Sequence, residues 1–362
     1  MRWHLLVLAG SAATAAAAPS LGSIIARLSP KLSNDEIPKF ETLPLEDAKA
    51  GKDLLDKMFN LTDIIPQQED PGVSTFSTAA CNANPARRIE WRSYSTSDRR
   101  AFMNAIKCLI DRPASGRLSP AKNRYEDFAR LHQMYMNNIH SNEKFMIWHR
   151  YFLWTWEQVL RDECGFDRAL PWWDETKDAG RFAQSTLFNG DNFGSLPSSA
   201  ACITNGAFAG LTCNIGPGNS NRAHCLARSV DEGQTRNCNS DYVRTCNSRN
   251  TYAEMHSCAE TGPHAYGHNG IGNIMADVSA SPSDPIFWMH HTFIDRNFRV
   301  WQNVAPSRRT TINGNDVNGA PLTMDTPVNV GPIFASTRIR DIMDTMSGVT
   351  IGGKTFCYRY DY

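Results

Sequence analysis

The sequence has no excess charge of either sign and no tract of basic residues. Its 37 lysine and arginine residues equal its 37 aspartate and glutamate residues over 362 positions. Proteins that attract nucleic acid or anionic membranes through their net field carry a surplus of positive charge. We therefore expect neither nucleic acid nor a membrane as a partner of this chain.

Long apolar runs are also scarce. The clearest one, LLVLAGSAATAAAA after Arg2, ends in small residues at Ala16–Ala18. Because this run is shorter than the ~20 residues that span a bilayer, it predicts a cleavable signal peptide over residues 1–18 rather than a membrane anchor. The mature protein is expected to be soluble, secreted and extracellular.

No C-x-x-C pair occurs among the ten cysteines, which argues against a thiolate zinc site. An even number of cysteines in an exported protein favours disulfide bonds, although the sequence does not give their pairing. The sequon Asn60-Leu61-Thr62 predicts a glycoprotein. Six cysteines fall within one polar segment: Cys202, Cys213, Cys225, Cys238, Cys246 and Cys258.

The chain divides into the signal peptide and two further parts. Residues 19–77 form a proline-interrupted leader, which is either a removable propeptide or a helical segment on the main domain. Residues 78–362 form a single catalytic domain. Within it, residues 179–261 are rich in Gly, Asn, Ser and Cys, with little periodicity. We expect a disulfide-stapled loop insertion there, which either walls a substrate entrance or is an inert surface elaboration.

Helical patterns surround this insertion. Ser97 is expected to cap a helix with the sequence DRRAFMNAIKCLI, after an extended segment RRIEWRSYS. The segment NRYEDFARLHQMYMNNIH predicts a second helix. His149 is expected to open a third, HRYFLWTWEQVLRDE, and the run FIDRNFRVW after His290 and His291 predicts a fourth.

Histidines are concentrated in two of these regions. A single histidine is more often a hydrogen-bonded core residue than a ligand, but seven of the ten lie in two stretches. His264 and His268 are four residues apart, so on a helix both imidazoles project from one face. His224 and His256 have no comparable setting. The seven are His132, His140 and His149 in the first stretch, and His264, His268, His290 and His291 in the second.

Neutral imidazoles that converge from two helices make a site for copper, zinc, iron or nickel. Neither stretch contains an acidic ligand motif, which leaves two alternatives: one zinc held by three histidines, or a pair of coppers. The spacing alone does not choose between them. A single zinc would leave three histidines over, so a binuclear site fits the count better.

The two stretches resemble the copper motifs of a known family. HSNEKFMIWHRYFLWTWEQVLRDECG, followed by LPWWDET, is similar to the first copper motif of tyrosinases and catechol oxidases. PHAYGHNGIGNIMADVSASPSDPIFWMHHTFIDR is similar to the second. Together they resemble the short secreted polyphenol oxidases of filamentous fungi, which have a type-3 binuclear copper site.

The resemblance implies two copper ions and a mainly α fold, in which a four-helix-bundle core holds the copper site inside disulfide-stapled loops and short strands. It also implies that His290 and Asp295 support the ligands without binding metal. It assigns His132, His140 and His149 to copper A, and His264, His268 and His291 to copper B.

The implied activity is the oxidation of ortho-diphenols, and of ortho-aminophenols, to ortho-quinones, with dioxygen as co-substrate and small phenols as the partners. Glu260 matches a carboxylate that holds a water for phenol deprotonation. Proficient monophenol hydroxylases carry Asn after the first copper B histidine, where this chain has Ala265, while Asn269 follows the second. We therefore expect monophenol hydroxylation to be weaker. Val278, at a substrate-gating position, is small enough to leave the copper A side open.

Two further departures and three alternatives complete the interpretation. Asn138 replaces the cysteine that forms a thioether in some relatives, and Tyr358-Arg359-Tyr360 resembles the motif that closes the family's core, so no C-terminal shielding domain is expected. The alternatives are a full tyrosinase with strong monophenolase activity, a dioxygen carrier like the hemocyanins, and a zinc hydrolase. A monomer or weak homo-oligomer is expected.

Overall fold

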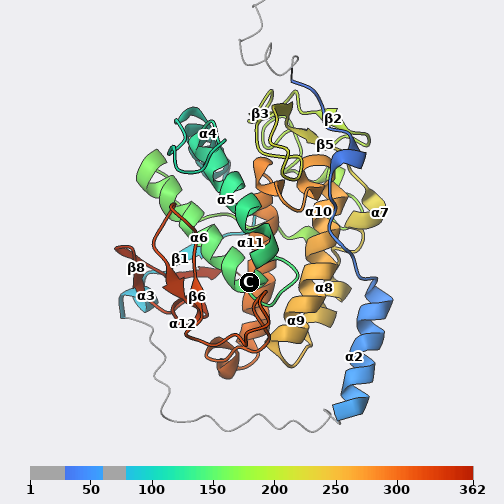
Figure 1. The fold of residues 1–362 in the computed structure, drawn as a ribbon, viewed down its shortest axis with the longest axis vertical. Helices are drawn as coiled ribbons and strands as arrows, with labels where there is room; N and C mark the ends of the chain where they lie inside the picture. The colour runs from blue at the N-terminus through green and yellow to red at the C-terminus, as the bar shows by residue number, and fades with distance from the viewer. Residues whose placement is uncertain (1–28, 60–78, 362) are drawn as a thin grey trace, which may run out of the picture.

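The computed structural model describes residues 29–59 and 79–361, and it is mainly helical around four long segments (Figure 1). Helices α5 (Arg124–Ile139) and α6 (Phe145–Cys164) form one antiparallel pair. The other pair consists of α11 (Phe287–Asn303) and a column made of α9 (Tyr252–Ala259), the π-turn η5 (Glu260–His264) and α10 (Ala265–Ile271). The predicted mainly α bundle is confirmed.

The centre of the bundle is the contact between α6 and α11. Every side chain of α6 from Phe145 to Leu160 is buried, so this helix is surrounded by protein on all sides. Trp156 on α6 stacks on Trp288 on α11, with ring centroids 4.0 Å apart and planes 3° apart. Burying such large aromatic surfaces supplies much of the apolar stabilisation of this core.

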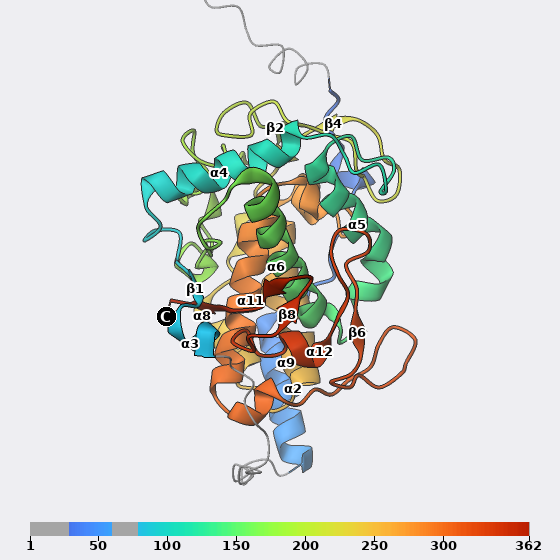
Figure 2. The ribbon, with the colours of Figure 1, turned by 90° about the vertical axis from the view of Figure 1, so that its left-hand side faces the viewer.

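Helix α4 (Thr96–Asp111) lies across α5 and α6 (Figure 2). Its N-cap is Ser95, whose hydroxyl accepts the backbone N–H of Asp98 at 3.1 Å, so the expectation of Ser97 as the cap was wrong. Helix α6 begins at Phe145, one turn before the position expected from His149. The aromatic pattern therefore located the helix but not its start.

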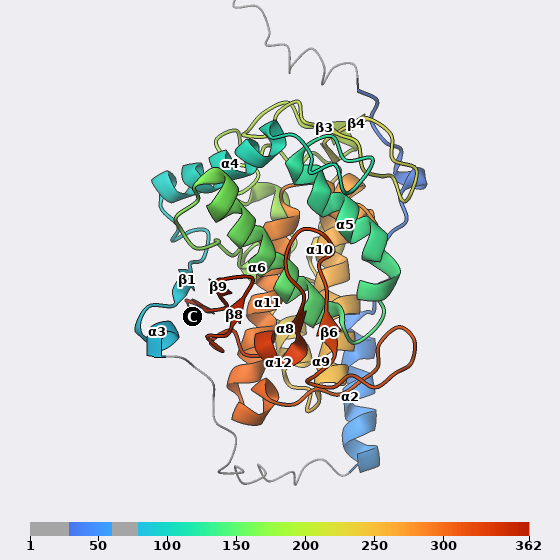
Figure 3. The same cartoon turned by 60° about the vertical axis from the view of Figure 1, so that its left-hand side comes forward.

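The strands are short and form two-stranded pairs only. The parallel pair β1–β10 joins the two ends of the catalytic domain, and the disulfide Cys81–Cys357 lies beside it. The C-terminal segment that carries β6 and α12 packs on α6 (Figures 2 and 3). Of the segment expected to be extended, only the β1 residues and one bridge at Glu90 are strand-like. The pairs are β1 (Ala86–Arg88) with β10 (Tyr358–Tyr360), β2 (Ala201–Cys202) with β5 (Ala227–Arg228), β3 (Thr212–Cys213) with β4 (His224–Cys225), β6 (Pro327–Val328) with β7 (Thr337–Arg338), and β8 (Thr350–Ile351) with β9 (Lys354–Thr355).

Residues 179–261 are more regular than the sequence pattern suggested. Strands β2 to β5 lie at one end of the bundle (Figure 1), and helices follow them. These helices, α7 (Glu232–Thr235), α8 (Ser240–Asn247) and α9, are capped by the side chains of Asp231, Asn239 and Thr251. The expectation of a loop without helices was therefore wrong over residues 232–259.

Eight of the ten cysteines form disulfides, as expected for that number. The pairs are Cys81–Cys357, Cys108–Cys164, Cys202–Cys225 and Cys246–Cys258. Cys213 and Cys238 are buried free thiols, so the preference for disulfides over free thiols does not extend to these two. Each thiol points at a backbone carbonyl, Cys213 at Ser283 and Cys238 at Pro263, and burial raises the pKa of both.

The described part of the leader is a layer on the catalytic domain. It contains the turn η1 (Asn34–Glu36) and helix α2 (Leu45–Phe59), which lies against α8 (Figure 1). The expected signal peptide and the Asn60 sequon lie outside the described residues. Within residues 29–59 and 79–361, none of the helices combines the length and apolarity needed to cross a membrane.

The remaining elements are short. They are α3 (Ala79–Ala83), η3 (Glu175–Lys177), η4 (Phe182–Gln184), η6 (Asn273–Ala276), η7 (Ser281–Ser283), η8 (Pro306–Arg309) and α12 (Ile339–Ile342).

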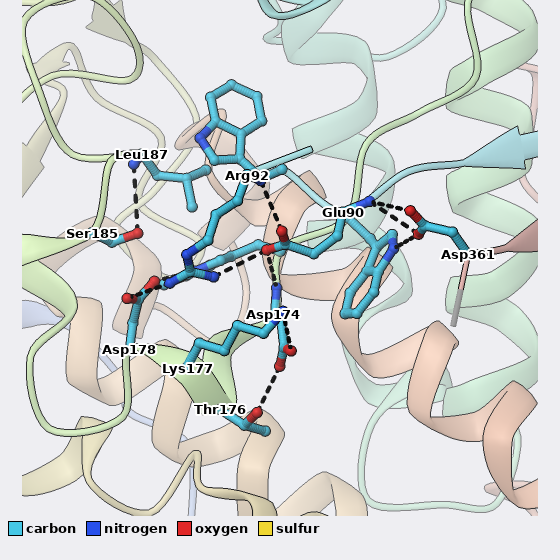
Figure 4. A network of polar contacts seen from close by, with 12 residues as sticks. Glu90, Arg92, Asp174, Thr176, Lys177, Asp178, Ser185, Leu187 and Asp361 are labelled. Carbon is cyan, nitrogen blue, oxygen red and sulfur yellow. Dashed lines mark hydrogen bonds and ion pairs between the residues drawn. The ribbon is translucent and has the colours of Figure 1, made fainter. Parts of the chain in front are cut away.

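A polar network anchors η3 to both ends of the catalytic domain (Figure 4). Arg92 donates to Glu90 at 3.1 Å and to Asp178 at 2.6 Å. The backbone N–H of Glu90 donates to the carboxylate of Asp361 at 3.0 Å, and that of Asp174 donates to Glu90 at 3.4 Å. Because this network fixes Asp174, it also positions the next residue, Glu175, whose side chain contacts His290.

Candidate metal centre

The first histidine cluster comes from one helix pair. His132 lies on α5, His140 is the C-cap residue of α5, and His149 lies on the second turn of α6. All three side chains are buried, and their candidate ligand nitrogens lie within 4.8 Å of one another. The fold therefore brings together the three residues that the sequence assigned to copper A.

The second cluster comes from the other helix pair. His264 ends the π-turn η5, His268 lies on α10, and His290 and His291 lie on the first turns of α11. Their candidate ligand nitrogens also lie within 4.8 Å of one another, and all four residues are buried. Wide turns of this kind interrupt helices most often at functional sites. Here the turn directs His264 toward His268 and His291.

Hydrogen bonds fix which ring nitrogen most of these histidines can offer to a metal. In five of the six expected ligands, Nδ1 contacts a backbone carbonyl and so carries the proton, which leaves a lone pair on Nε2. The pairs are His132 with Ser279 at 2.9 Å, His140 with Met136 at 3.3 Å, His149 with Phe145 at 2.9 Å, His264 with Glu260 at 3.0 Å and His268 with Met275 at 2.7 Å.

The freed nitrogens lack ordinary partners. Among the described residues, none forms a hydrogen bond with the buried Nε2 atoms of His140 and His264. The Nε2 atoms of His132 and His149 lie 3.4 Å apart, although the carbonyl contacts place the proton on Nδ1 in both rings. Two facing lone pairs repel each other, whereas a cation between them would be coordinated. The donor set therefore fits bound metal ions.

The electrostatic setting favours neutral imidazoles. Burial lowers the pKa of His132 to about 4. Burial, together with neighbouring imidazoles, lowers the pKa of His140, His149, His264, His268 and His291 well below the ordinary value. Since a metal binds the unprotonated ring, these histidines are already in the binding form at neutral pH.

The two clusters face each other across the bundle. The rings of His149 and His291 are stacked, with centroids 4.5 Å apart and planes 15° apart. The rings of His140 and His264 are also nearly parallel, at 6.1 Å and 23°. Phe145 contacts His149 and His264, with a centroid distance of 4.6 Å to the former and 4.5 Å to the latter. An all-imidazole double site with aromatic walls fits two copper ions.

His290 has a partner that the sequence did not reveal. Its Nδ1 lies 2.7 Å from Oε1 of Glu175, a fully buried carboxylate in the PWWDET segment. Burial raises the pKa of Glu175, and the nearby His290 and the Cys238 thiol lower it in part. A Cβ atom at Gly267 would lie 2.4 Å from His290 Cε1, so only glycine at this α10 position leaves room for the imidazole.

Glu260 is an integral part of the site. Its carboxylate accepts the backbone N–H of Ser141 at 2.8 Å and lies 2.8 Å from Nε2 of His256. Both side chains are buried, so a solvated loop charge is excluded for Glu260. His256 belongs to neither histidine cluster, but its pairing with Glu260 was not foreseen. The spacing of four residues along one helical column was the available signal for this pair.

The structure also places the three other residues that the resemblance connects with substrate selection. Ala265 is buried directly after His264. The side-chain amide of Asn269 bonds twice to the backbone of Phe40, from Nδ2 to O at 2.8 Å and from the Phe40 N–H to Oδ1 at 3.2 Å. The backbone N–H of Val278 donates to the carbonyl of Pro38 at 2.9 Å. The leader therefore contacts Val278, the residue that was expected to leave the copper A side open.

Asp295 does not orient a ligand imidazole, contrary to the expectation from the resemblance. Its carboxylate accepts a hydrogen bond from Nε of Arg150 at 2.6 Å and another from the guanidinium of Arg88 at 3.4 Å. The hydroxyls of Tyr358 and Tyr360 donate to it at 2.7 Å and 2.6 Å. Two buried arginines so close by compete more strongly than a neutral imidazole for the carboxylate. Asp295 thus connects α11 to α6, β1 and β10.

Known proteins share this arrangement. The pattern described as the common central domain of tyrosinase matches residues 122–304. Tyrosinase P of Aspergillus terreus is 30% identical, with 76% of this chain and 92% of that protein covered. A polyphenol oxidase from Thermothelomyces thermophila is 26% identical, with a TM-score of 0.70 over 89% of this chain and 99% of that one.

A functional unit of octopus hemocyanin shares the fold at 19% identity, with a TM-score of 0.51 over 76% of this chain and 68% of that one. The family pattern spans about half of the sequence and includes all seven histidines of the two clusters. The chain therefore belongs to the tyrosinase family of binuclear copper oxidases.

Proposed function

We propose that this copper oxidase converts ortho-diphenols, and ortho-aminophenols, to ortho-quinone products with dioxygen, and that it hydroxylates monophenols only weakly. Two ortho-diphenols and one dioxygen give two ortho-quinones and two waters. When bound, the copper pair supplies the two-electron exchange between phenol and dioxygen. His132, His140 and His149 would hold one copper, and His264, His268 and His291 the other.

The residues around the six ligands support a flat aromatic substrate. Phe287 packs on His291 with centroids 4.1 Å apart, and Phe145 packs on His149 and His264. Both phenylalanines are fully buried, so they keep water away from the metal-binding nitrogens. A dry site with aromatic walls is the usual setting for binding small aromatic molecules.

The observation that carries the preference for ortho-diphenols is the apolar residue, Ala265, directly after the first copper B histidine, His264. A monophenol must lose its proton before its ring is hydroxylated, and a water held by polar side chains assists that loss. Ala265 has no polar side-chain atom. Asn269 has one, but it follows the second copper B histidine, His268, and not the first.

Glu260 supports the same conclusion. Its two oxygens contact Ser141 and His256, so the carboxylate is fixed by protein groups on both sides. A carboxylate that already has these two partners holds a water less freely than one that points into an open cavity. Deprotonation of a monophenol is therefore poorly assisted, whereas the oxidation of an ortho-diphenol needs no hydroxylation of the ring.

The alternatives differ in what they require. A full tyrosinase requires the polar assistance that Ala265 lacks. The likeness to a hemocyanin unit extends to the fold alone, and dioxygen carriage requires a site from which phenols are excluded permanently. A hydrolase with one zinc held by three histidines would use only one of the two facing clusters of buried histidines.

Initial rates of dioxygen uptake with catechol, 2-aminophenol and phenol test the proposal on the copper-loaded protein. We expect catechol and 2-aminophenol to be oxidised, with phenol slower by at least about 100-fold, the order of a lost acid–base contribution. Phenol turnover comparable to that of catechol, without a lag and without added diphenol, would contradict the proposal and favour a full tyrosinase.

Export is part of the proposal. The four disulfides are typical of proteins that fold in an oxidising compartment. We expect the protein in the culture medium of an expressing fungal cell, with an N-terminus after residue 18. Intracellular retention of a chain that still begins at Met1 would count against export.

A further inference from the structure

The leader places an aromatic ring on the copper-binding histidines. The ring of Phe40 stacks on His268, with centroids 4.2 Å apart and planes 23° apart. It also meets His264 edge-on at 5.0 Å and His140 at 5.8 Å. Phe40 therefore touches imidazoles of both clusters, although it lies in a segment that precedes the catalytic domain in the sequence.

A side chain next to a copper ligand holds Phe40 in this position. The two hydrogen bonds between the Asn269 amide and the Phe40 backbone satisfy both the N–H and the C=O of that residue. Nearby, the carbonyl of Pro38 accepts the N–H of Val278, and the N–H of Leu43 donates to the carbonyl of Thr261 at 2.9 Å. The backbone is thus bound before, at and after Phe40.

Further contacts secure the segment before Phe40. Leu32 and Ile37 are buried against Ala276. Nδ2 of Asn273 donates to the carbonyl of Leu32 at 3.2 Å and to Asn34 at 3.1 Å. These partners all lie on or beside η6, the turn that follows α10.

The segment after Phe40 is held by the column of helices. Tyr242 on α8 donates its hydroxyl to the carbonyl of Leu43, and Arg249 donates to the carbonyl of Ala48 at 2.5 Å. Figure 1 shows the segment, in blue, running beside α10 to α2 at the lower end of the molecule. The first cysteine of the sequence is Cys81, so no disulfide can hold residues 29–59 in place.

With Phe40 in this position the metal-binding site is closed. His264 and His268 are 0% exposed, and His140 is 6% exposed. A phenol ring that approached His268 face-on would need the space that the Phe40 ring occupies. We propose that residues 29–59 are an autoinhibitory strap, with Phe40 as the residue that blocks the substrate and Asn269 as the residue that clamps it.

This inference rests on the proposed oxidation of phenols, because it identifies the blocked ligand as an aromatic ring. The strap competes with the substrate, and only non-covalent contacts hold it. The fraction of the protein that can bind a phenol is therefore set by the equilibrium between the bound and the released strap. Substitution of Phe40 or removal of the strap raises that fraction. Copper is not needed for the strap to close over the histidines.

Chemical labelling of the metal-free, full-length protein tests the strap without relying on activity. Diethyl pyrocarbonate modifies neutral, accessible imidazoles, and peptide mass spectrometry gives the rate for each histidine. We expect Phe40→Ala to increase the labelling rates of His264 and His268 by about 10-fold or more. Lys39→Ala, at an exposed neighbouring position, should leave them unchanged.

His224 reports on the integrity of the fold in the Phe40→Ala protein, because it is buried and its ring contacts the Arg222 carbonyl rather than Phe40. It should stay slow while this variant is folded. Equal, slow labelling of His264 and His268 in the wild type and in Phe40→Ala would overturn the inference. A second protein covers the case in which Phe40→Ala unfolds and all three histidines react quickly.

The second protein is the full chain with a protease site inserted between residues 60 and 78, cut after folding, and separated from its strap. Labelling of His264 and His268, and catechol oxidation by the copper-loaded sample, should both rise by about 10-fold or more on separation. Unchanged labelling overturns the strap. Faster labelling without catechol oxidation would support the autoinhibitory strap and would contradict the proposed function.

Discussion

The imidazole of His149 on α6 is stacked on the imidazole of His291 on α11, with centroids 4.5 Å apart and planes 15° apart. This contact joins the two helix pairs at the point where the two histidine clusters meet. Since one ring belongs to each cluster, the two metal positions are neighbours within a single buried site. The predictions below follow from this shared site and from the residues that surround it.

Replacing one ligand should affect the whole site. We expect His149→Ala and His291→Ala each to bind less than two coppers per chain and to lose at least about 100-fold of the catechol oxidation rate. The reason is that dioxygen reduction at this site requires both metals. Metal analysis and oxygen uptake measure the two effects. His224→Ala removes a buried histidine outside the clusters and should retain both coppers.

His290 and His291 are adjacent but should behave differently. The Nδ1 atom of His290 contacts Glu175, whereas Nδ1 of His291 is buried with no hydrogen-bond partner in the part of the chain that the structure describes. We expect His290→Gln to keep two coppers per chain and His291→Gln to lose copper. Copper content after dialysis against a weak chelator distinguishes them. Loss of a copper from His290→Gln alone would make His290 the ligand.

A single substitution should raise monophenol hydroxylation. Ala265→Asn adds an amide next to His264, where it can orient a water for phenol deprotonation. We expect the ratio of phenol to catechol turnover to rise by about 10-fold, a fraction of what acid–base assistance supplies. Ala265→Leu, which is branched at Cγ like asparagine but has no amide, should not raise it. An equal increase in both variants would show that side-chain size is the cause.

Asp295 should be a major contributor to stability. It is buried between Arg150 and Arg88, and Asp295→Asn would leave two buried guanidinium groups without their carboxylate. Breaking a buried ion pair from one side costs about 3–5 kcal/mol of unfolding free energy. Chemical denaturation at neutral pH measures it. Asp162→Asn, which removes a half-exposed carboxylate paired with Lys354, should cost far less.

The contribution of Asp295 to stability should also depend on pH. Burial alone would raise the pKa of Asp295, but Arg150, Arg88 and the two tyrosine hydroxyls lower it below its ordinary value of about 3.9. A carboxyl whose pKa is lower in the folded state stabilises the protein fully above the unfolded pKa. The difference in stability between the wild type and Asp295→Asn should therefore shrink as the pH falls below about 4. A difference that grows with acidity would contradict this assignment.

The histidine clusters were predictable because short-range spacing encodes them. His264 and His268 are one helical turn apart, and the mainly α bundle follows from the long apolar periods on either side. The helices within residues 232–259 were missed because they are short and polar. Their N-cap residues, Asp231, Asn239 and Thr251, were the signal that could have revealed them.

The contacts that tune the site could not be read from the sequence, because they join distant segments. Asn269 and Phe40 are 229 positions apart, and His290 and Glu175 are 115 apart. No local pattern marks either pair. Asp295 was assigned to the wrong partner for the same reason, since Arg88 and Tyr360 reach it only after β1 and β10 pair.

The most direct test of the binuclear copper site is the metal content of the purified, full-length protein, measured together with oxygen uptake on catechol and phenol. The account predicts two coppers per chain and faster uptake with catechol, whether or not the strap has been removed. One zinc per chain, or no copper retained after loading with copper salts, would contradict it.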